Sequence, residues 1–193
     1  MVVADVAGKG FAASLIMASV KAMLPYVSAD GGVAKLLARL NRRLALELGR
    51  GEFVALVVAR YDPSARKVEL ANAGAPDPYR LVRGRRAEAL PVPGPRLPLG
   101  ARGEVAYESR TVEIGTGGRL LLLSDGLPEA RDAAGEPLGY EALEAMISED
   151  PRTDAPSRWL ANLFDQVQRR SLREPDDDWT AAMLVPCEDR EGP

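Results

Sequence analysis

The order of hydrophobic and polar positions predicts helices near both ends of the chain and strands between them. Two helical segments come first, at about residues 11–26 and 33–48, where apolar residues recur every three or four positions. The first is apolar over much of its surface, so we expect it to be buried. The second carries Arg39, Arg42 and Arg43 on a face that we expect to be exposed.

From Phe53 the pattern changes to apolar runs separated by turn residues, which is typical of antiparallel strands. The expected strands cover residues 53–62, 67–74, 79–83, 104–114 and 118–126, and a last strand covers 179–186. Two more helices are expected at 140–147 and about 156–171. The order of elements favours α+β layers with helices packed outside the sheet. The proline-rich stretch 91–100 is expected to be a loop inside one domain, because the flanking strands are too few to close separate cores.

Composition then limits the chemistry. The chain has 193 residues, no histidine and one cysteine, which removes histidine-ligated metal sites, disulfide frameworks and most nucleophile–base pairs. The formal charge of -3 does not favour nucleic acid as a partner. The sequence has neither an apolar stretch of about 20 residues, as a membrane span needs, nor the features of a signal peptide. We therefore expect a cytoplasmic domain without a membrane segment.

Three acidic groups lie at the ends of predicted strands: Asp5 in ADVAGKG, Asp125 in LLLLSDG, and Asp176 to Asp178 in EPDDDWTAAML. Magnesium and manganese prefer oxygen ligands, and two such ions about 3.5–4 Å apart can activate a water and neutralise a phosphoryl group. Each group taken singly is more often a turn or a solvated loop. The residues alone leave both a metal site and fortuitous acidic turns open.

Read together and in order, several segments resemble the sporulation stage II E (SpoIIE) branch of the metal-dependent serine/threonine phosphatases, relatives of protein phosphatase 2C. ADVAGKGFAASLIMA is similar to the D-V-S-G-K-G loop and the helix after it, and VELANAGAPDPYRL is similar to the N-A-G-H-P-P strand. The resemblance continues through RLPLG, RLLLLSDGLPEARDAAGEPLG and DDDWTAAMLV.

The resemblance implies a single phosphatase domain over residues 1–193, with a protein phosphatase 2C-like αββα sandwich of antiparallel sheets flanked by helices that lacks the N-terminal strands. It implies two Mn²⁺ or Mg²⁺ ions, one held by Asp5 and the Val6 carbonyl and the other by Asp125 and Asp177, with Asp178 as the weaker candidate. Catalysis would then use a metal-activated water and no protein nucleophile.

The implied substrate is a phosphoserine or phosphothreonine on a regulatory protein of the anti-sigma-factor antagonist type. That substrate would place the protein in signal transduction and sigma factor regulation. In this branch the catalytic domain often follows a sensory domain, and the two helices after the glycine loop act as a switch.

The sequence also departs from the family pattern. The G-G-D-x-Y-D motif, whose first aspartate bridges both metals in the family, does not occur in these 193 residues. Ala7, Ala55 and Ala75 replace a common serine, threonine and histidine. We therefore expect weak metal binding and little hydrolysis by this chain alone. The alternative hypothesis is a catalytically inactive phosphatase-like module that binds the same regulator.

Overall fold

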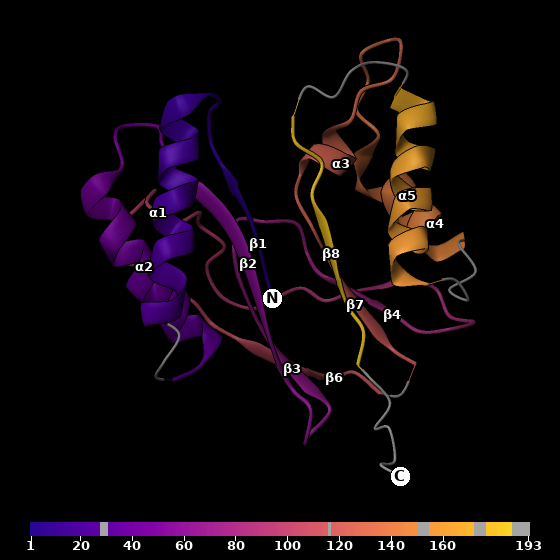
Figure 1. Ribbon diagram of the computed structural model, residues 1–193, viewed down its shortest axis with the longest axis horizontal. Helices are drawn as coiled ribbons and strands as arrows, with labels where there is room; N and C mark the ends of the chain where they lie inside the picture. The colour runs from indigo at the N-terminus through magenta and orange to yellow at the C-terminus, as the bar shows by residue number, and fades with distance from the viewer. Residues whose placement is uncertain (28–30, 116, 150–154, 172–176, 187–193) are drawn as a thin grey trace. The chain divides into compact units, whose positions relative to one another are not determined.

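A computed structural model describes residues 1–27, 31–115, 117–149, 155–171 and 177–186. The described elements form two four-stranded antiparallel sheets accompanied by helices (Figure 1). Each sheet belongs to one of two compact units of the chain. In the part of the chain that the structure describes, no helix is both long and apolar enough to cross a membrane.

The first unit comprises Met1–Asp77 and Pro91–Glu113. Its sheet has the order β1-β2-β3-β6, from strands β1 (Val2–Val6), β2 (Val54–Asp62), β3 (Lys67–Ala73) and β6 (Arg110–Glu113). Helices α1 (Phe11–Val27) and α2 (Val33–Glu47) cover one face of this sheet (Figure 1). The apolar side chains of α2 and of the strands form one continuous core.

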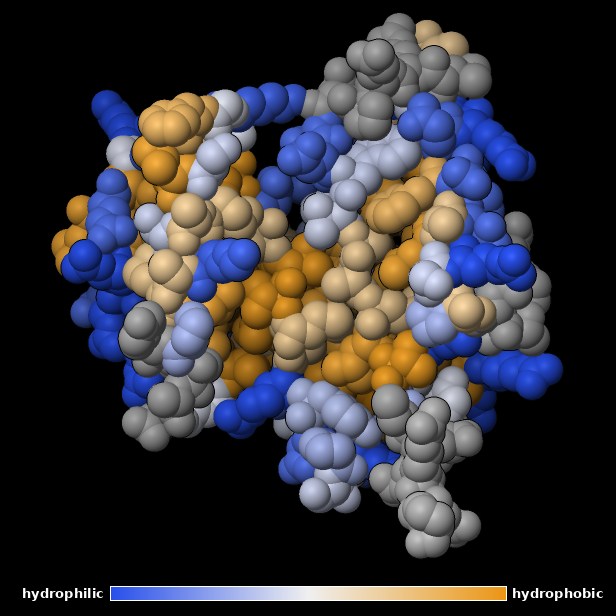
Figure 2. Space-filling view, viewed as in Figure 1, coloured by the Kyte–Doolittle hydropathy of each residue, from blue (hydrophilic) through white to orange (hydrophobic). Residues whose placement is uncertain are grey.

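The predicted burial agrees with the structure for most of α2 and not for α1. Leu37 and Leu40 of α2 have no exposed surface, and Arg42 and Arg43 are exposed as expected. Arg39, expected on the same exposed face, is half-buried. The expected burial of α1 is wrong, because Phe11 is 80% exposed, Leu15 is 54% exposed, and Val20 alone among the described side chains of this helix is buried. Figure 2 shows hydrophobic residues uncovered along this helix. An all-round apolar composition therefore does not tell which faces of a helix are covered.

The second unit comprises Pro78–Leu90 and Ile114–Pro193. Its sheet has the order β5-β4-β7-β8, from strands β4 (Tyr79–Leu81), β5 (Glu88–Ala89), β7 (Arg119–Leu123) and β8 (Ala181–Leu184). Helices α3 (Gly126–Glu129), α4 (Gly139–Glu149) and α5 (Pro156–Ser171) belong to the same unit. Its core centres on the fully buried Trp159 of α5, which packs with leucines of β4, β7 and α4.

Four predicted strands are shorter than the pattern indicated by more than one residue: those at 79–83, 118–126 and 179–186 form only Tyr79–Leu81, Arg119–Leu123 and Ala181–Leu184, and the largest difference is at 104–114. Of residues 104–114 only Arg110–Glu113 form a strand. Tyr107 is buried in the preceding loop, where its hydroxyl donates a hydrogen bond to the Leu97 carbonyl at 2.8 Å. The alternating pattern there reflects loop packing against the core of the first unit, which includes Tyr107.

Tyr107 gives a stability prediction at alkaline pH. Burial raises the pKa of its hydroxyl from 10.0 to about 12. Because the folded-state pKa is the higher one, this contribution to stability is fully present below pH 10 and is lost as the pH rises toward 12. We expect the free energy of unfolding of Tyr107→Phe to fall less steeply than that of the parent chain across this range. Urea unfolding at a series of pH values measures the free energy of unfolding of each chain, with Tyr61→Phe as the control. Equal slopes against pH for Tyr107→Phe and the parent would contradict the prediction.

Candidate metal centre

Antiparallel pairing of β7 with β8 brings two acidic segments together that lie far apart in sequence. Leu123, the last residue of β7, is opposite Ala181, the first residue of β8. The residues that follow β7 therefore face the residues that precede β8. The pairing continues one step beyond the strands, because the Ser124 amide donates to the Thr180 carbonyl at 2.9 Å.

The Ser124 side chain holds these two segments in place. It is 3% exposed, and its hydroxyl donates to the Asp178 carbonyl at 3.1 Å while accepting from the Thr180 amide at 3.0 Å. A buried hydroxyl that is used as both donor and acceptor fixes backbone position, since either partner left unpaired would be destabilising. The Ser124 hydroxyl thus fixes the backbone position of Asp178.

Gly126 allows the same two segments to approach closely. A Cβ atom at this position would lie 2.6 Å from the Asp178 carbonyl oxygen and 3.2 Å from Cδ1 of Trp179. The first distance is shorter than real carbon–oxygen contacts, and the atom it meets is backbone. Only glycine, which has no Cβ atom, therefore fits at this position without moving the backbone of Asp178.

The result is a pair of carboxylates in the second unit. Asp125 and Asp177 each offer a carboxylate oxygen within 4.8 Å of the other. Asp125 is half-buried and precedes α3, but its side chain makes no capping hydrogen bond to that helix. Asp177 is exposed, and its Oδ1 accepts the Asp178 amide at 2.9 Å. Two carboxylates this close repel each other unless a cation or a proton lies between them. Oxygen-only donors suit a hard divalent ion, so the pair fits Mg²⁺ or Mn²⁺.

The other predicted members of the last acidic group have different positions. Asp178 is exposed, and among the described residues its side chain is not in the carboxylate group that contains Asp125 and Asp177. Its contribution is the backbone carbonyl that accepts the Ser124 hydroxyl. Asp176 lies outside the described residues.

Asp5 and Val6 are at the end of β1 in the first unit. Asp5 pairs with Ala55 of β2 and Val6 with Val54, and the Ala7 amide donates to the Phe53 carbonyl at 2.9 Å. The glycine loop then turns into α1 with Gly8 at φ 106° and Gly10 at φ 83°, values that favour glycine. Asp5 is half-buried. The ladder thus fixes Asp5 at the strand end from which the loop starts.

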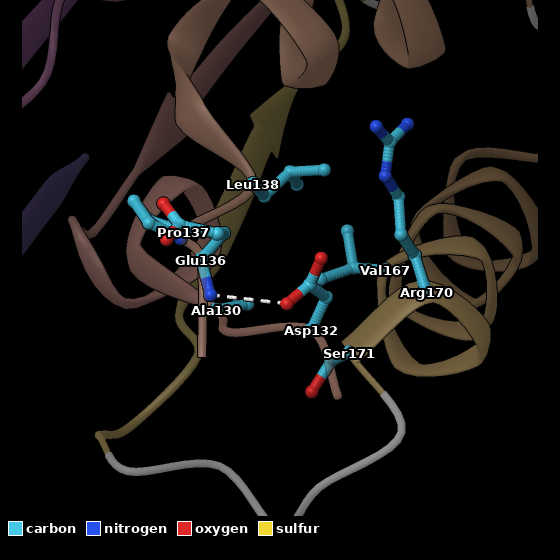
Figure 3. Close-up of a pocket in the computed structure, with 8 residues that line it drawn as sticks. All are labelled: Ala130, Asp132, Glu136, Pro137, Leu138, Val167, Arg170 and Ser171. Carbon is cyan, nitrogen blue, oxygen red and sulfur yellow. Dashed lines mark hydrogen bonds between the residues drawn. The ribbon is translucent and has the colours of Figure 1, made fainter. Parts of the chain in front are cut away.

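A small pocket in the second unit is a separate feature (Figure 3). Its volume is about 40 Å³, and it is lined by Ala130, Asp132, Glu136, Pro137, Leu138, Val167, Arg170 and Ser171. The Asp132 carboxylate turns back to accept the Glu136 amide at 3.0 Å. This volume suits water and not a phosphorylated side chain, and Asp125 and Asp177 are not among the lining residues.

Solved structures define the class of fold. The chain is similar to the SiaA-PP2C domain of Pseudomonas aeruginosa, with a TM-score of 0.80 and 21% identity, over 95% of this chain and 73% of that one. It is also similar to RsbX, solved in complex with magnesium, with a TM-score of 0.65 and 16% identity, over 94% of this chain and 78% of that one. The predicted α+β, PP2C-like fold of two antiparallel sheets and helices is confirmed.

The family follows from the sequence comparison. The chain belongs to the family of stage II sporulation protein E (SpoIIE), whose model matches residues 1–185. It is 26% identical over 184 residues to the phosphoserine phosphatase RsbU of Bacillus subtilis (strain 168). The match covers 94% of this chain and 54% of RsbU, so the chain spans about half the length of that curated relative. The resemblance is thereby confirmed, and an unrelated protein with fortuitous acidic turns is ruled out.

Proposed function

We propose that the chain is a metal-dependent phosphatase domain that removes phosphate from serine or threonine of a regulatory protein. Membership of the SpoIIE family supports this activity. The observation that carries the proposal is the Asp125–Asp177 carboxylate pair, because Ser124 and Gly126 hold two like charges within 4.8 Å of each other. Two carboxylates that repel each other are suited to binding a divalent cation, because its positive charge offsets the repulsion.

The proposed ligands lie at the end of β1, directly after β7 and shortly before β8. Asp125 and Asp177 would hold one Mn²⁺ or Mg²⁺ ion, and Asp5 with the Val6 carbonyl would hold the other. Asp178 would support the pair through its backbone, and its carboxylate remains the weaker candidate ligand. RsbX, similar in fold, was solved with magnesium, which supports this choice of ion.

When bound, the two ions supply an activated water and neutralise the charge that develops on the phosphoryl group. The chain's own residues orient the ions. Asp125 is half-buried and follows Ser124, whose hydroxyl holds the backbone of Asp178 and Thr180. The exposed Asp177 would be the ligand that an arriving phosphorylated segment reaches. The net reaction adds one water across the phosphorus–oxygen ester bond and gives inorganic phosphate and the serine or threonine hydroxyl.

The relationship to RsbU extends the proposal to a partner. We assign as substrate a phosphorylated regulator of the anti-sigma-factor antagonist type, with control by an upstream sensory domain and action in the cytoplasm. Specificity for such a protein would come from surfaces outside the carboxylate pair.

Titration with Mn²⁺ tests the proposal. We expect the chain to bind Mn²⁺, followed as loss of the free-ion electron paramagnetic resonance signal, and to release phosphate from a phosphoserine-bearing antagonist protein only when Mn²⁺ is present. Hydrolysis is expected to be slow, so binding is the more sensitive measurement. An isothermal phosphate-release assay with excess chelator is the control.

The outcomes separate the two hypotheses. Metal binding together with metal-dependent release supports the phosphatase. Binding of the phosphorylated antagonist without any release at saturating Mn²⁺ would support the inactive binding module. A chain that binds neither metal nor antagonist would contradict both.

A further inference from the structure

The hairpin between β4 and β5 in the second unit is strongly basic. Its sequence RLVRGRR, residues 80–86, carries four arginines and no acidic residue, in a protein whose formal charge is -3. Arg83, Arg85 and Arg86 are exposed. A dense group of exposed arginines produces a local positive potential whatever the net charge of the molecule. The hairpin therefore attracts negatively charged ligands.

The hairpin is anchored to the core of the second unit. Leu81 and Leu90, on its two sides, have no exposed surface, and the Leu90 amide donates to the Pro78 carbonyl at 2.8 Å. The Ala87 amide donates to the Ser148 hydroxyl of α4 at 3.1 Å. The arginines are thus carried by a backbone that is already fixed, which lowers the entropy lost when a partner binds.

Acidic neighbours pair with two of the four arginines. Arg80 donates from Nε to Glu88 of β5 at 3.0 Å, and Nε of Arg86 lies 3.5 Å from a carboxylate oxygen of Glu144 on α4. Arg83, in the turn, forms no ion pair among the described residues. The charge of Arg83 can therefore pair with a ligand from outside the chain.

The hairpin and the carboxylate pair lie at opposite ends of one sheet. Leu81 of β4 is opposite Arg119, the first residue of β7, whereas Asp125 follows the last strand residue of β7. Figure 1 shows α3, which starts directly after Asp125, at the far end of β7 from the loop that follows β4. Asp125 comes six positions after Arg119, a distance of at most about 20 Å in extended chain. A small protein domain, about 30 Å across, can reach both ends at once.

We infer that the β4–β5 hairpin is a docking surface for an acidic segment of the phosphorylated regulator. The inference rests on the proposed function, which leaves specificity for that protein to surfaces outside the carboxylate pair. Aspartate and glutamate side chains are the matching chemistry, because the planar guanidinium group of arginine pairs with a carboxylate through two parallel hydrogen bonds. The phosphoryl group itself is not the ligand of the hairpin, since it has to reach the metal ions at the other end of the sheet.

The binding of two labelled phosphoserine peptides to the full chain tests the inference. A spacer of about six residues, which covers about 20 Å when extended, separates the phosphoserine from a run of glutamates in one peptide and of glutamines in the other. With Mn²⁺ present and at low salt, we expect the glutamate peptide to bind about 10-fold more tightly than the glutamine peptide. The preference should fade as salt is added, because exposed charges are then screened.

Variants at Arg83 assign the preference to the hairpin. We expect Arg83→Glu to reduce it about 5-fold and Arg83→Lys, which keeps the charge, to retain most of it. The matched control is Arg50→Glu, which makes the same charge change at an exposed turn of the first unit. Its preference should stay within about 2-fold of the parent's. The Mn²⁺ affinity of Arg83→Glu should equal the parent's, since the charge at the hairpin is screened from Asp125 at physiological salt.

The outcomes separate the inference from the proposed function. If the parent binds both peptides equally, and more tightly with Mn²⁺ than without, the inference is wrong and the proposed function stands. If Arg83→Glu and Arg50→Glu lose the preference equally, overall charge is the cause and the inference is again wrong. Binding of phosphatidylserine vesicles through Arg83, without a preference for the glutamate peptide, would assign the hairpin to a lipid surface and overturn the inference. If neither peptide binds, or Mn²⁺ affects neither, the proposed function fails and the inference fails with it.

Discussion

Replacing Asp125 by asparagine is expected to weaken Mn²⁺ binding by about 100-fold and to remove metal-dependent phosphate release. The substitution keeps the shape of the side chain but removes one of the two negative charges that lie within 4.8 Å of each other. A direct ligand should matter at least as much as the supporting residues of metal sites, whose loss typically weakens affinity by about 10- to 100-fold. The fold should survive, because the Asp125 side chain makes no capping hydrogen bond that asparagine would lose.

The measurement is paired titration of the parent and the variant with Mn²⁺, followed by phosphate release at saturating metal. Asp165→Asn is the matched control, since Asp165 is an exposed aspartate on α5 outside the carboxylate pair. Relief of repulsion between Asp125 and Asp177 should also leave the metal-free variant slightly more stable to urea. An unchanged Mn²⁺ affinity would remove Asp125 from the site.

Replacing Gly126 by alanine is expected to have the second largest effect. In an open helix, alanine would be favoured over glycine by about 1 kcal/mol. Here the added Cβ would lie 2.6 Å from the Asp178 carbonyl oxygen, so the two backbone segments must separate. Overpacking of this kind destabilises by about 1–3 kcal/mol. Separation would also strain the Ser124 bonds to Asp178 and Thr180, and with them the position of Asp177.

Urea unfolding and Mn²⁺ titration together measure this second prediction. The control is Gly115→Ala in the same unit, because a Cβ at Gly115 meets no atom within 4 Å and its φ is not left-handed. We expect Gly126→Ala to lose both stability and metal affinity and Gly115→Ala to lose neither. A Gly126→Ala variant with the parent's stability would show that the β7 and β8 segments can move apart without penalty.

Periodicity predicted the longer elements because each has enough residues to display it. The second helix, the paired strands after it and the helix from Pro156 to Ser171 all formed close to the expected positions. Strand β5, with two residues, and helix α3, with four, were missed because neither is long enough to repeat the period of its pattern. Burial of α1 was predicted from its composition, which carries no information on the side from which it is covered.

The candidate site was predicted in part for a related reason. Asp125 and Asp177 could be named because each is next to an apolar strand and a family resemblance orders them. Ser124 could not, because its role depends on the pairing of β7 with a strand about 60 residues away. Two buried asparagines of the first unit were missed similarly. Asn41 of α2 is fully buried and bonds the backbone of Gly100, Arg102 and Gly103, and Asn72 bonds that of Ala75 and Pro76. A polar residue inside an apolar run was the available signal for both.

The two bonds of the Ser124 hydroxyl make the separation of Asp125 and Asp177 a property of the main chain. The strands around them would keep their register if either carboxylate were lengthened, shortened or neutralised. An engineer who wished to retune which ion is preferred could therefore exchange Asp177 for glutamate or asparagine while leaving Ser124 and Gly126 untouched. Selectivity between ions and the integrity of the sheet would then be separable traits of the proposed metal site.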